Sequence, residues 1–231
     1  MNFAPPTDSS TTNERKPMKR RDFSMQLAAV GLGSVWAGTA AAQGGPIEGT
    51  HYTKLSQPVA VTAPAGKIEV LEFFSYGCPH CYALEPTLET WAKRLPADVV
   101  FKRVPVGFNA LYENYQKIYY ALEAMGQVEH MHRKVFGAIH QQRQRLDKEA
   151  DIAAFMTANG VDGAKFMDLY KSFSVQTKAR QAQQLSQGYK IDGVPALAVQ
   201  GRYVTSGSMA GSNERALAVT DALVQSARKP A

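Results

Sequence analysis

The sequence predicts an α/β domain that is interrupted by an α-helical insertion, and three observations lead to this prediction. Residues 67–104 have the pattern of a strand, a helix and a second strand, the unit that forms neighbouring parallel strands of a sheet. Residues 109–187 show helical spacing of apolar side chains and no strand pattern. Residues 194–205 then return to a strand pattern, so sheet elements flank the helices on both sides.

The first 42 residues have the features of a cleaved export signal, which would not form part of the fold. Lys19-Arg20-Arg21 precede an uncharged stretch, Met25 to Ala42, which ends in three alanines. A retained membrane anchor is the alternative, since about 18 apolar residues can cross a bilayer. Three glycines lower the hydrophobicity of this stretch, so cleavage is favoured. The arginine pair followed by Phe23 also resembles a twin-arginine signal.

The charge of the chain gives no indication of a nucleic-acid partner. The formal net charge is +6, and the basic residues are scattered along the sequence. They are not interleaved with aromatic residues, as they are in many nucleic-acid grooves. We therefore expect an ordinary solvated surface.

Residues 43–108 form the first part of the predicted α/β domain. Lys67 to Phe74 is a nearly continuous apolar run, which suits a strand buried on both faces, and only Glu72 interrupts its second half. The next segment has a helical pattern with Pro86 inside it, where a kink is expected. Residues 99–104 supply the second strand.

The predicted helical insertion, residues 109–187, contains four helical patterns, of which the last runs from Phe166 to about Gln187. The second part of the α/β domain, residues 188–231, begins with two short strands around a two-residue turn at Gln200-Gly201. A closing helix is expected from Ser212 to Arg228.

The only two cysteines, Cys78 and Cys81, stand where the first strand turns into the helix. Unpaired amides and the positive end of the helix dipole favour a thiolate there, so Cys78 is expected to be the attackable sulfur. Pro79 suits the first helical turn, and His80 places an imidazole beside the sulfur. Cys81 is expected to be buried and to act as the resolving thiol. The pair therefore predicts a redox-active disulfide, Cys78–Cys81.

Metal binding is a weaker interpretation of the cysteine pair. A zinc site needs a second ligand pair, which the remaining histidines do not offer at a matching spacing, and we expect His130, His132 and His140 to be surface residues of a helix. A copper site would need a segment rich in Met and His beside Cys78. A purely structural disulfide is disfavoured, because a two-residue loop constrains little of the unfolded chain. We expect neither a metal nor a cofactor.

The motifs resemble those of the DsbA family of thiol:disulfide oxidoreductases. The resemblance rests on Glu72-Phe73-Phe74 before Cys78-Pro79-His80-Cys81, on Lys102, and on Gly193-Val194-Pro195-Ala196. Pro-His between the cysteines is the specific part, because Cys-x-x-Cys alone indicates only the thioredoxin superfamily. The match extends over nearly all of the chain after the predicted signal. It implies a thioredoxin fold with an inserted α-helical domain.

The resemblance also assigns further positions. It implies that Val194-Pro195 form a cis-proline loop, which packs against the disulfide and pairs with substrate backbone. It implies that Glu72 is a buried acid beneath the cysteines, that Lys102 is its partner, and that the two relay the proton of Cys81. Tyr76-Gly77 and Pro105-Val106-Gly107 depart from the family pattern at groove-lining positions.

The function implied is that of a soluble periplasmic enzyme that donates its disulfide to reduced, unfolded exported proteins through a mixed disulfide at Cys78. A quinone-linked membrane protein resembling DsbB would reoxidise it, and we expect a monomer. A disulfide isomerase or reductase is the main alternative. A metal- or peptide-binding module of the thioredoxin type is a further one.

Overall fold

The computed structural model describes residues 1–2 and 45–228. Its contacts divide the chain into residues 1–43 and residues 44–231, and the second unit is the one considered below. The predicted export signal, residues 1–42, lies outside the described residues except for its first two positions.

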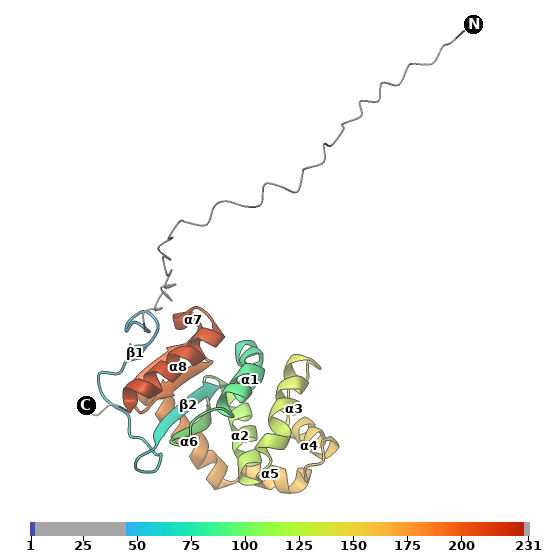
Figure 1. The fold of residues 1–231 in the computed structure, drawn as a ribbon. Helices are drawn as coiled ribbons and strands as arrows, with labels where there is room; N and C mark the ends of the chain where they lie inside the picture. The colour runs from blue at the N-terminus through green and yellow to red at the C-terminus, as the bar shows by residue number, and fades with distance from the viewer. Residues whose placement is uncertain (3–44, 229–231) are drawn as a thin grey trace, which may run out of the picture. The chain divides into compact units, whose positions relative to one another are not determined.

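A five-stranded sheet with the order β1-β5-β4-β2-β3 organises the domain (Figure 1). The strands are β1 (Thr53–Lys54), β2 (Ile68–Phe74), β3 (Val99–Pro105), β4 (Ala196–Val199) and β5 (Tyr203–Ser206). β2 pairs in parallel with β3 and antiparallel with β4, and every residue of β2 is buried. The predicted strand buried on both faces is therefore confirmed.

The helices form two groups. α1 (Pro79–Ala92), α7 (Gly207–Ala210) and α8 (Asn213–Ala227) belong to the two parts of the α/β domain. The insertion between β3 and β4 consists of α2 (Ala110–Ala124), α3 (Val128–His140), α4 (Glu149–Ala158), α5 (Gly163–Lys171) and α6 (Phe173–Gly188). This arrangement confirms the predicted α/β class with a helical insertion.

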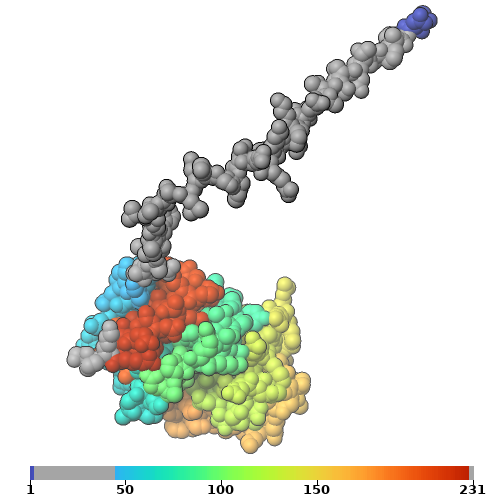
Figure 2. All heavy atoms as spheres, viewed as in Figure 1, coloured from blue at the N-terminus to red at the C-terminus, as the bar shows by residue number. Residues whose placement is uncertain are grey.

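Two hydrophobic cores cover the two faces of the sheet. Ile68 and Val70 of β2 pack with Leu84 and Leu88 of α1 and with the apolar face of α8. The alternate residues of β2 contribute to a larger core that includes the insertion helices. In the space-filling view α8, in red, lies against α1, while α3 to α5 of the insertion, in yellow and orange, form the part of the surface away from α8 (Figure 2). α1 also contacts α3, so the helix that follows the cysteines touches both groups.

Three predictions about local structure were wrong or incomplete. The single helix expected from Phe166 to Gln187 is two helices, α5 and α6, because Ser172 is extended (φ −67°, ψ 153°) and its hydroxyl caps α6 by accepting from the N–H of Val175. The short helix α7 was not predicted. The predicted turn at Gln200-Gly201 is present, and both residues have positive φ, 50° and 67°, but it is one residue longer than predicted, because Val199 pairs with Tyr203 and Arg202 belongs to the turn.

Replacement of Gly201 by alanine is expected to destabilise the protein more than the same replacement of Gly126. Both glycines have a φ of +67°, which costs an alanine about 1–2 kcal/mol. A Cβ at Gly126 would meet nothing within 4 Å, whereas at Gly201 it would lie 2.1 Å from the carbonyl oxygen of Val59. Urea unfolding measures both losses of free energy, provided that the dependence of the unfolding free energy on urea concentration is the same in the variants and the wild type. Equal losses of unfolding free energy in the two variants would show that the backbone at Val59 moves away from the added Cβ without cost, contrary to the expectation.

Candidate active site

The turn between β2 and α1 places Cys78 at the N-cap of the helix. The backbone N–H of Cys78 donates to the carbonyl of Ser75 (3.0 Å), and the Sγ of Cys78 accepts from the N–H of Cys81 (3.4 Å). Pro79 occupies the first helical turn, where no amide hydrogen is needed. Gly77 is closely covered by α2, since a Cβ there would lie 2.7 Å from the ring of Tyr112.

The two thiols are in different electrostatic environments. The hydrogen bond from the Cys81 thiol, the backbone N–H groups of Cys81 and His80, and the charge of His80 together outweigh burial and lower the pKa of Cys78 to about 6. Burial is the main cause that raises the pKa of Cys81 well above its usual range, and the nearby Cys78 and Glu72 raise it further. Cys78 is 5% exposed and Cys81 is 0% exposed. At neutral pH the reduced pair therefore holds a thiolate at Cys78 and a thiol at Cys81.

The loop before β4 closes over Cys78. The Val194-Pro195 peptide bond is cis, and the carbonyl oxygen of Val194 lies 3.2 Å from the Sγ of Cys78. A cavity of about 400 Å³ begins there; His80, Ile191, Val194, Pro195 and Met209 are among the residues that line it. The structure thus brings together the cysteine turn and Val194-Pro195, which are more than 100 residues apart in the sequence.

The expected pair of Glu72 with Lys102 is wrong. Lys102 Nζ instead bonds to Glu69 (2.9 Å), while Glu72 Oε2 accepts from Arg103 Nε (3.1 Å). The reason lies in the strand register: Glu72 of β2 is opposite Arg103 of β3, and neighbouring side chains on a strand point to opposite faces. Lys102 therefore lies on the face of Glu69 and cannot reach Glu72.

Glu72 belongs to a group of polar side chains, all buried except the partly exposed Arg103, which we call the polar cluster: Glu72, Arg103, Glu85, His132 and Tyr76. Arg103 Nη2 donates to Glu85 Oε1, so one guanidinium binds two carboxyl groups. His132 Nε2 lies 3.3 Å from Glu85 Oε2, and His132 Nδ1 is hydrogen-bonded to the hydroxyl of Tyr76 (2.8 Å). The cluster thereby connects β2, β3, α1, α3 and the turn before Cys78.

The two carboxyl groups of the polar cluster titrate differently. Burial, and next the charge of Glu85, raises the pKa of Glu72 to about 8, although Arg103 opposes the shift. Burial also acts to raise the pKa of Glu85, but His132 and Arg103 outweigh it and hold that pKa below its usual value. Near neutral pH the charge therefore resides on Glu85, and Glu72 carries a proton beside the cysteines.

Most residues of the polar cluster were not predicted from the sequence. Glu85 lies one turn after Cys81 on α1 and could have been recognised, because residues at i and i+4 share a helix face. Arg103 could not be chosen over Lys102 without the register of β3. The prediction that His132 lies on the surface is wrong: it is only 3% exposed, because α3 turns it toward Phe74 and Glu85. His140 is also partly buried, and its Nε2 is 2.8 Å from the carbonyl oxygen of Tyr76.

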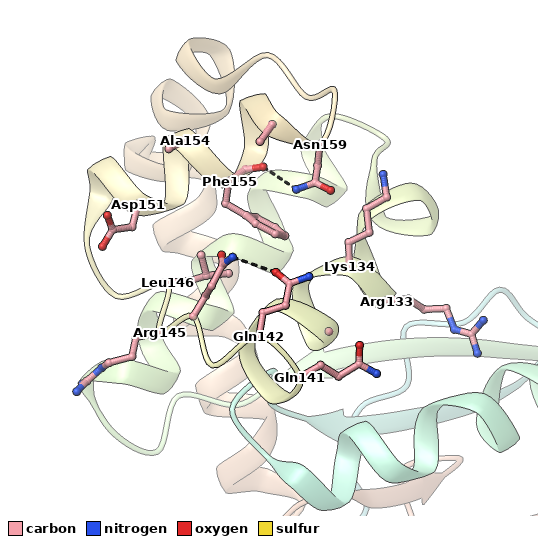
Figure 3. A pocket seen from close by; sticks show the side chains of 13 residues that line it. Arg133, Lys134, Gln141, Gln142, Arg145, Leu146, Asp151, Ala154, Phe155 and Asn159 are labelled. Carbon is pink, nitrogen blue, oxygen red and sulfur yellow. Dashed lines mark hydrogen bonds between the residues drawn. The ribbon is translucent and has the colours of Figure 1, made fainter.

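Other cavities lie away from the sulfurs. Figure 3 shows one of about 790 Å³ in the helical insertion, lined among others by Gln141, Leu146 and Phe155, and neither cysteine borders it. A cavity of about 510 Å³ between α1 and α3 reaches Arg103 and His132. In the described part of the chain, no three His, Cys, Asp or Glu side chains are grouped closely enough to hold a metal ion. Within the same residues, no helix is long and apolar enough to cross a membrane.

Comparisons with known proteins place this geometry in a family. The model of the DSBA-like thioredoxin domain matches residues 88–218, which begin after the cysteine pair. The thiol:disulfide interchange protein DsbA of Bordetella pertussis is 45% identical over 215 residues, which cover 92% of this chain and 100% of the relative. The crystal structure of Pseudomonas aeruginosa DsbA has a TM-score of 0.75 and 40% identity, covering 78% of this chain and 93% of that one. A structure of the oxidoreductase DsbA from Xylella fastidiosa has a TM-score of 0.74 at 30% identity, covering 79% and 98% of the two chains.

The alkylation rate of Cys78 is expected to rise with pH through a midpoint of about 6, because the thiolate is the reactive form. A pH series with iodoacetamide on the reduced protein measures this midpoint. His80→Ala is expected to raise it, since the charge of the imidazole is lost while the backbone N–H remains. A wild-type midpoint close to the ordinary thiol value of 9.0 would contradict the lowered pKa of Cys78.

The loss of Arg103 is expected to destabilise the protein far more than the loss of Lys102. Arg103→Met leaves two buried carboxyl groups without their cation, a change that costs about 3–5 kcal/mol. Lys102→Met also removes the cation from a buried carboxyl group, Glu69, but the lysine is 38% exposed, and Glu69 Oε2 still accepts from the N–H and the hydroxyl of Thr62, so the cost is smaller. Unfolding in urea at pH 7 compares the two variants. If Lys102→Met loses more free energy of unfolding than Arg103→Met, Lys102 would be the more important cation for stability.

Proposed function

We propose that this chain, which belongs to the family of DSBA-like thioredoxin domain proteins, donates the Cys78–Cys81 disulfide to reduced, unfolded exported proteins. It is a thiol:disulfide oxidoreductase, as its relatives are named. The observation that carries the direction of the reaction is the environment of Cys78, which lowers the pKa of its thiol to about 6. A stabilised thiolate is a stabilised reduced form, so the disulfide readily accepts electrons.

The reaction proceeds in two exchange steps. A substrate thiolate attacks the Sγ of Cys78, the Cys78–Cys81 bond breaks, and Cys81 leaves as a thiolate. A second substrate thiolate then attacks the substrate sulfur of the mixed disulfide, and Cys78 leaves as a thiolate. The substrate loses two electrons and forms one disulfide, while the enzyme gains two electrons and becomes the dithiol.

Glu72 supplies the proton that the first step requires. A buried Cys81 thiolate is costly, since its pKa lies well above the usual range. Glu72 has a pKa of about 8 and therefore carries a proton at neutral pH. The proton moves from the Glu72 carboxyl to the Cys81 sulfur, and it returns when Cys81 attacks during reoxidation. Arg103, and not Lys102 as expected from the sequence, is the cation that pairs with Glu72.

Substrates bind along the loop of Val194 and Pro195. The cavity beside this loop begins at His80 and has apolar walls at Ile191 and Met209, which suits an extended, unfolded segment. The carbonyl of Val194 lies next to Cys78, where it can accept from the backbone of a chain held in a mixed disulfide.

The enzyme acts in the periplasm and is reoxidised there by a quinone-linked membrane partner that resembles DsbB. The export signal expected at residues 1–42 supports this location. The partner binds in the same cavity beside Val194 and Pro195, and its disulfide accepts electrons from the Cys78 thiolate. The enzyme works as a monomer.

Mixing the oxidised protein with a reduced, unfolded protein substrate tests the proposal. The wild type is expected to introduce disulfides rapidly, Cys78→Ala to introduce none, and Cys81→Ala to retain substrates as a mixed disulfide when oxidised substrate is supplied. Thiol titration and non-reducing electrophoresis follow the two outcomes. The proposal fails if Cys78→Ala matches the wild type, or if the disulfide proves less oxidising than that of glutathione, as expected of a reductase.

A further inference from the structure

We propose that His132 is a positioning residue for this reaction: from the helical insertion it holds Glu85 ionised against Arg103, and so leaves Glu72 protonated beside Cys81. The inference rests on the proposed function, because it concerns the proton step of the same exchange. It assigns a role in the redox chemistry to a residue of the insertion, a part of the chain that contributes neither cysteine.

The contacts form one continuous path from the active-site turn to Glu72. The hydroxyl of Tyr76 is 2.8 Å from His132 Nδ1, and His132 Nε2 is 3.3 Å from Glu85 Oε2. The other oxygen of Glu85 accepts from Arg103 Nη2, and Arg103 Nε donates to Glu72 Oε2 (3.1 Å). His132 is thus separated from Glu72 by two side chains.

The polar cluster has one permanent cation for two carboxyl groups, so only one carboxylate can be fully neutralised. Glu85 has Arg103 at one oxygen and His132 beside the other. Glu72 has Arg103 at one oxygen. Neither Glu72 Oε1 nor Glu85 Oε2 has a hydrogen bond of normal geometry among the described residues, but His132 Nε2 lies 3.3 Å from Glu85 Oε2. The contact with His132 is therefore what distinguishes Glu85 from Glu72 and places the negative charge on Glu85.

The neutral tautomer of His132 follows from its neighbours. Burial, as the main cause, raises the pKa of Tyr76 well above its usual range, so its phenol keeps its proton and can donate it to Nδ1. Burial also lowers the pKa of His132, which favours the neutral ring. With Nδ1 accepting from Tyr76, the ring proton is on Nε2 and faces Glu85. Edge-to-face contacts with Phe74 and Phe136 hold the ring in this orientation.

The remaining titratable groups around the cluster do not replace His132. Glu89 of α1 faces the same ring, but it is bound to Arg133 (3.3 Å). Tyr119 of α2 faces Arg103 and both carboxyl groups, and burial raises its pKa, so it stays neutral. Cys78 and Cys81 face Glu72 and supply only negative charge when ionised.

Loss of the contact with His132 therefore acts on Glu72 at a distance. Without it the ionised form of Glu85 is less stable, and the pKa of Glu85 rises. Less negative charge next to Glu72, and less competition for Arg103, then stabilise ionised Glu72, whose pKa falls. A lower pKa leaves less protonated Glu72 for Cys81 at neutral pH.

The experiment measures the first exchange step against pH, at a fixed concentration of substrate thiolate, in the full-length oxidised protein. In the wild type the rate should fall as pH rises through about 8, where Glu72 ionises. His132→Asn retains an amide near Nδ1 but cannot reach Glu85, and it should move the fall to lower pH. A shift of roughly one unit would mean a tenfold change in the ratio of protonated to ionised Glu72. His132→Gln, which places an amide near Nε2, should restore most of the wild-type profile.

His130→Asn is the matched control on the same helix. His130 is exposed and contacts the carbonyl of Asn159 (3.1 Å), outside the polar cluster, so its pH profile should match the wild type. A second control is Glu85→Gln, which should shift the pH profile at least as far as His132→Asn does. Adding His132→Asn to Glu85→Gln should then cause no further shift, because His132 acts through Glu85. Should His132→Asn fail to fold, Tyr76→Phe, which removes only the hydroxyl, should give a smaller shift in the same direction.

A direct measurement separates positioning from a purely structural role. The carboxyl carbon of Glu72, labelled with ¹³C and identified by its absence in Glu72→Gln, should titrate at lower pH in reduced His132→Asn than in the wild type. The inference is overturned if His132→Asn is merely less stable and keeps the wild-type midpoints. It is also overturned if His130→Asn shifts them equally. Failure of the wild type to oxidise substrates at any pH would instead refute the proposed function.

Discussion

The hydrogen bond from the backbone N–H of Cys81 to the sulfur of Cys78 is the interaction on which the site depends. It makes a cysteine the N-cap of α1, where a serine or aspartate is more usual, and so directs the unpaired amides of a helix terminus at a thiolate. β2 fixes where that helix begins, because the strand is buried along its whole length and ends four residues before Cys78. The buried sheet, the cap and the low pKa of one thiol are therefore parts of a single arrangement.

The polar cluster adds a second constraint, that of charge balance in a buried site. Two carboxyl groups share Arg103, and the insertion contributes the histidine that makes them unequal. Buried ion pairs often contribute little net stability, because desolvation offsets their attraction. A cluster of this composition is better explained by chemistry than by stability, since it keeps one carboxyl group protonated, and that carboxyl group, Glu72, is near enough to Cys81 to influence its pKa.

Particular residues show why sequence reasoning succeeded for some positions and failed for others. Cys78, Cys81, Pro79 and His80 are adjacent in the chain, and their geometry follows from the start of one helix. The break between α5 and α6 at Ser172 was not predicted. A helix cap inside a long helical pattern depends on local backbone angles, which the spacing of apolar residues does not reveal. Lys102 and Arg103 are neighbours of equal charge, and only the register of β3 against β2 decides which of them faces Glu72.

The sequence by itself determined the α/β class with its helical insertion, the strand buried on both faces, and the location of the dithiol at a helix terminus. These follow from hydrophobic periodicity and from short motifs, which act over a few residues. The placement of Val194 against Cys78 was expected from the family resemblance, and the structure shows it. Tertiary structure alone decided the partners of the buried acids and the burial of His132. Those features depend on strand register and helix rotation, which are set by packing between segments distant in the chain, and no local pattern encodes them.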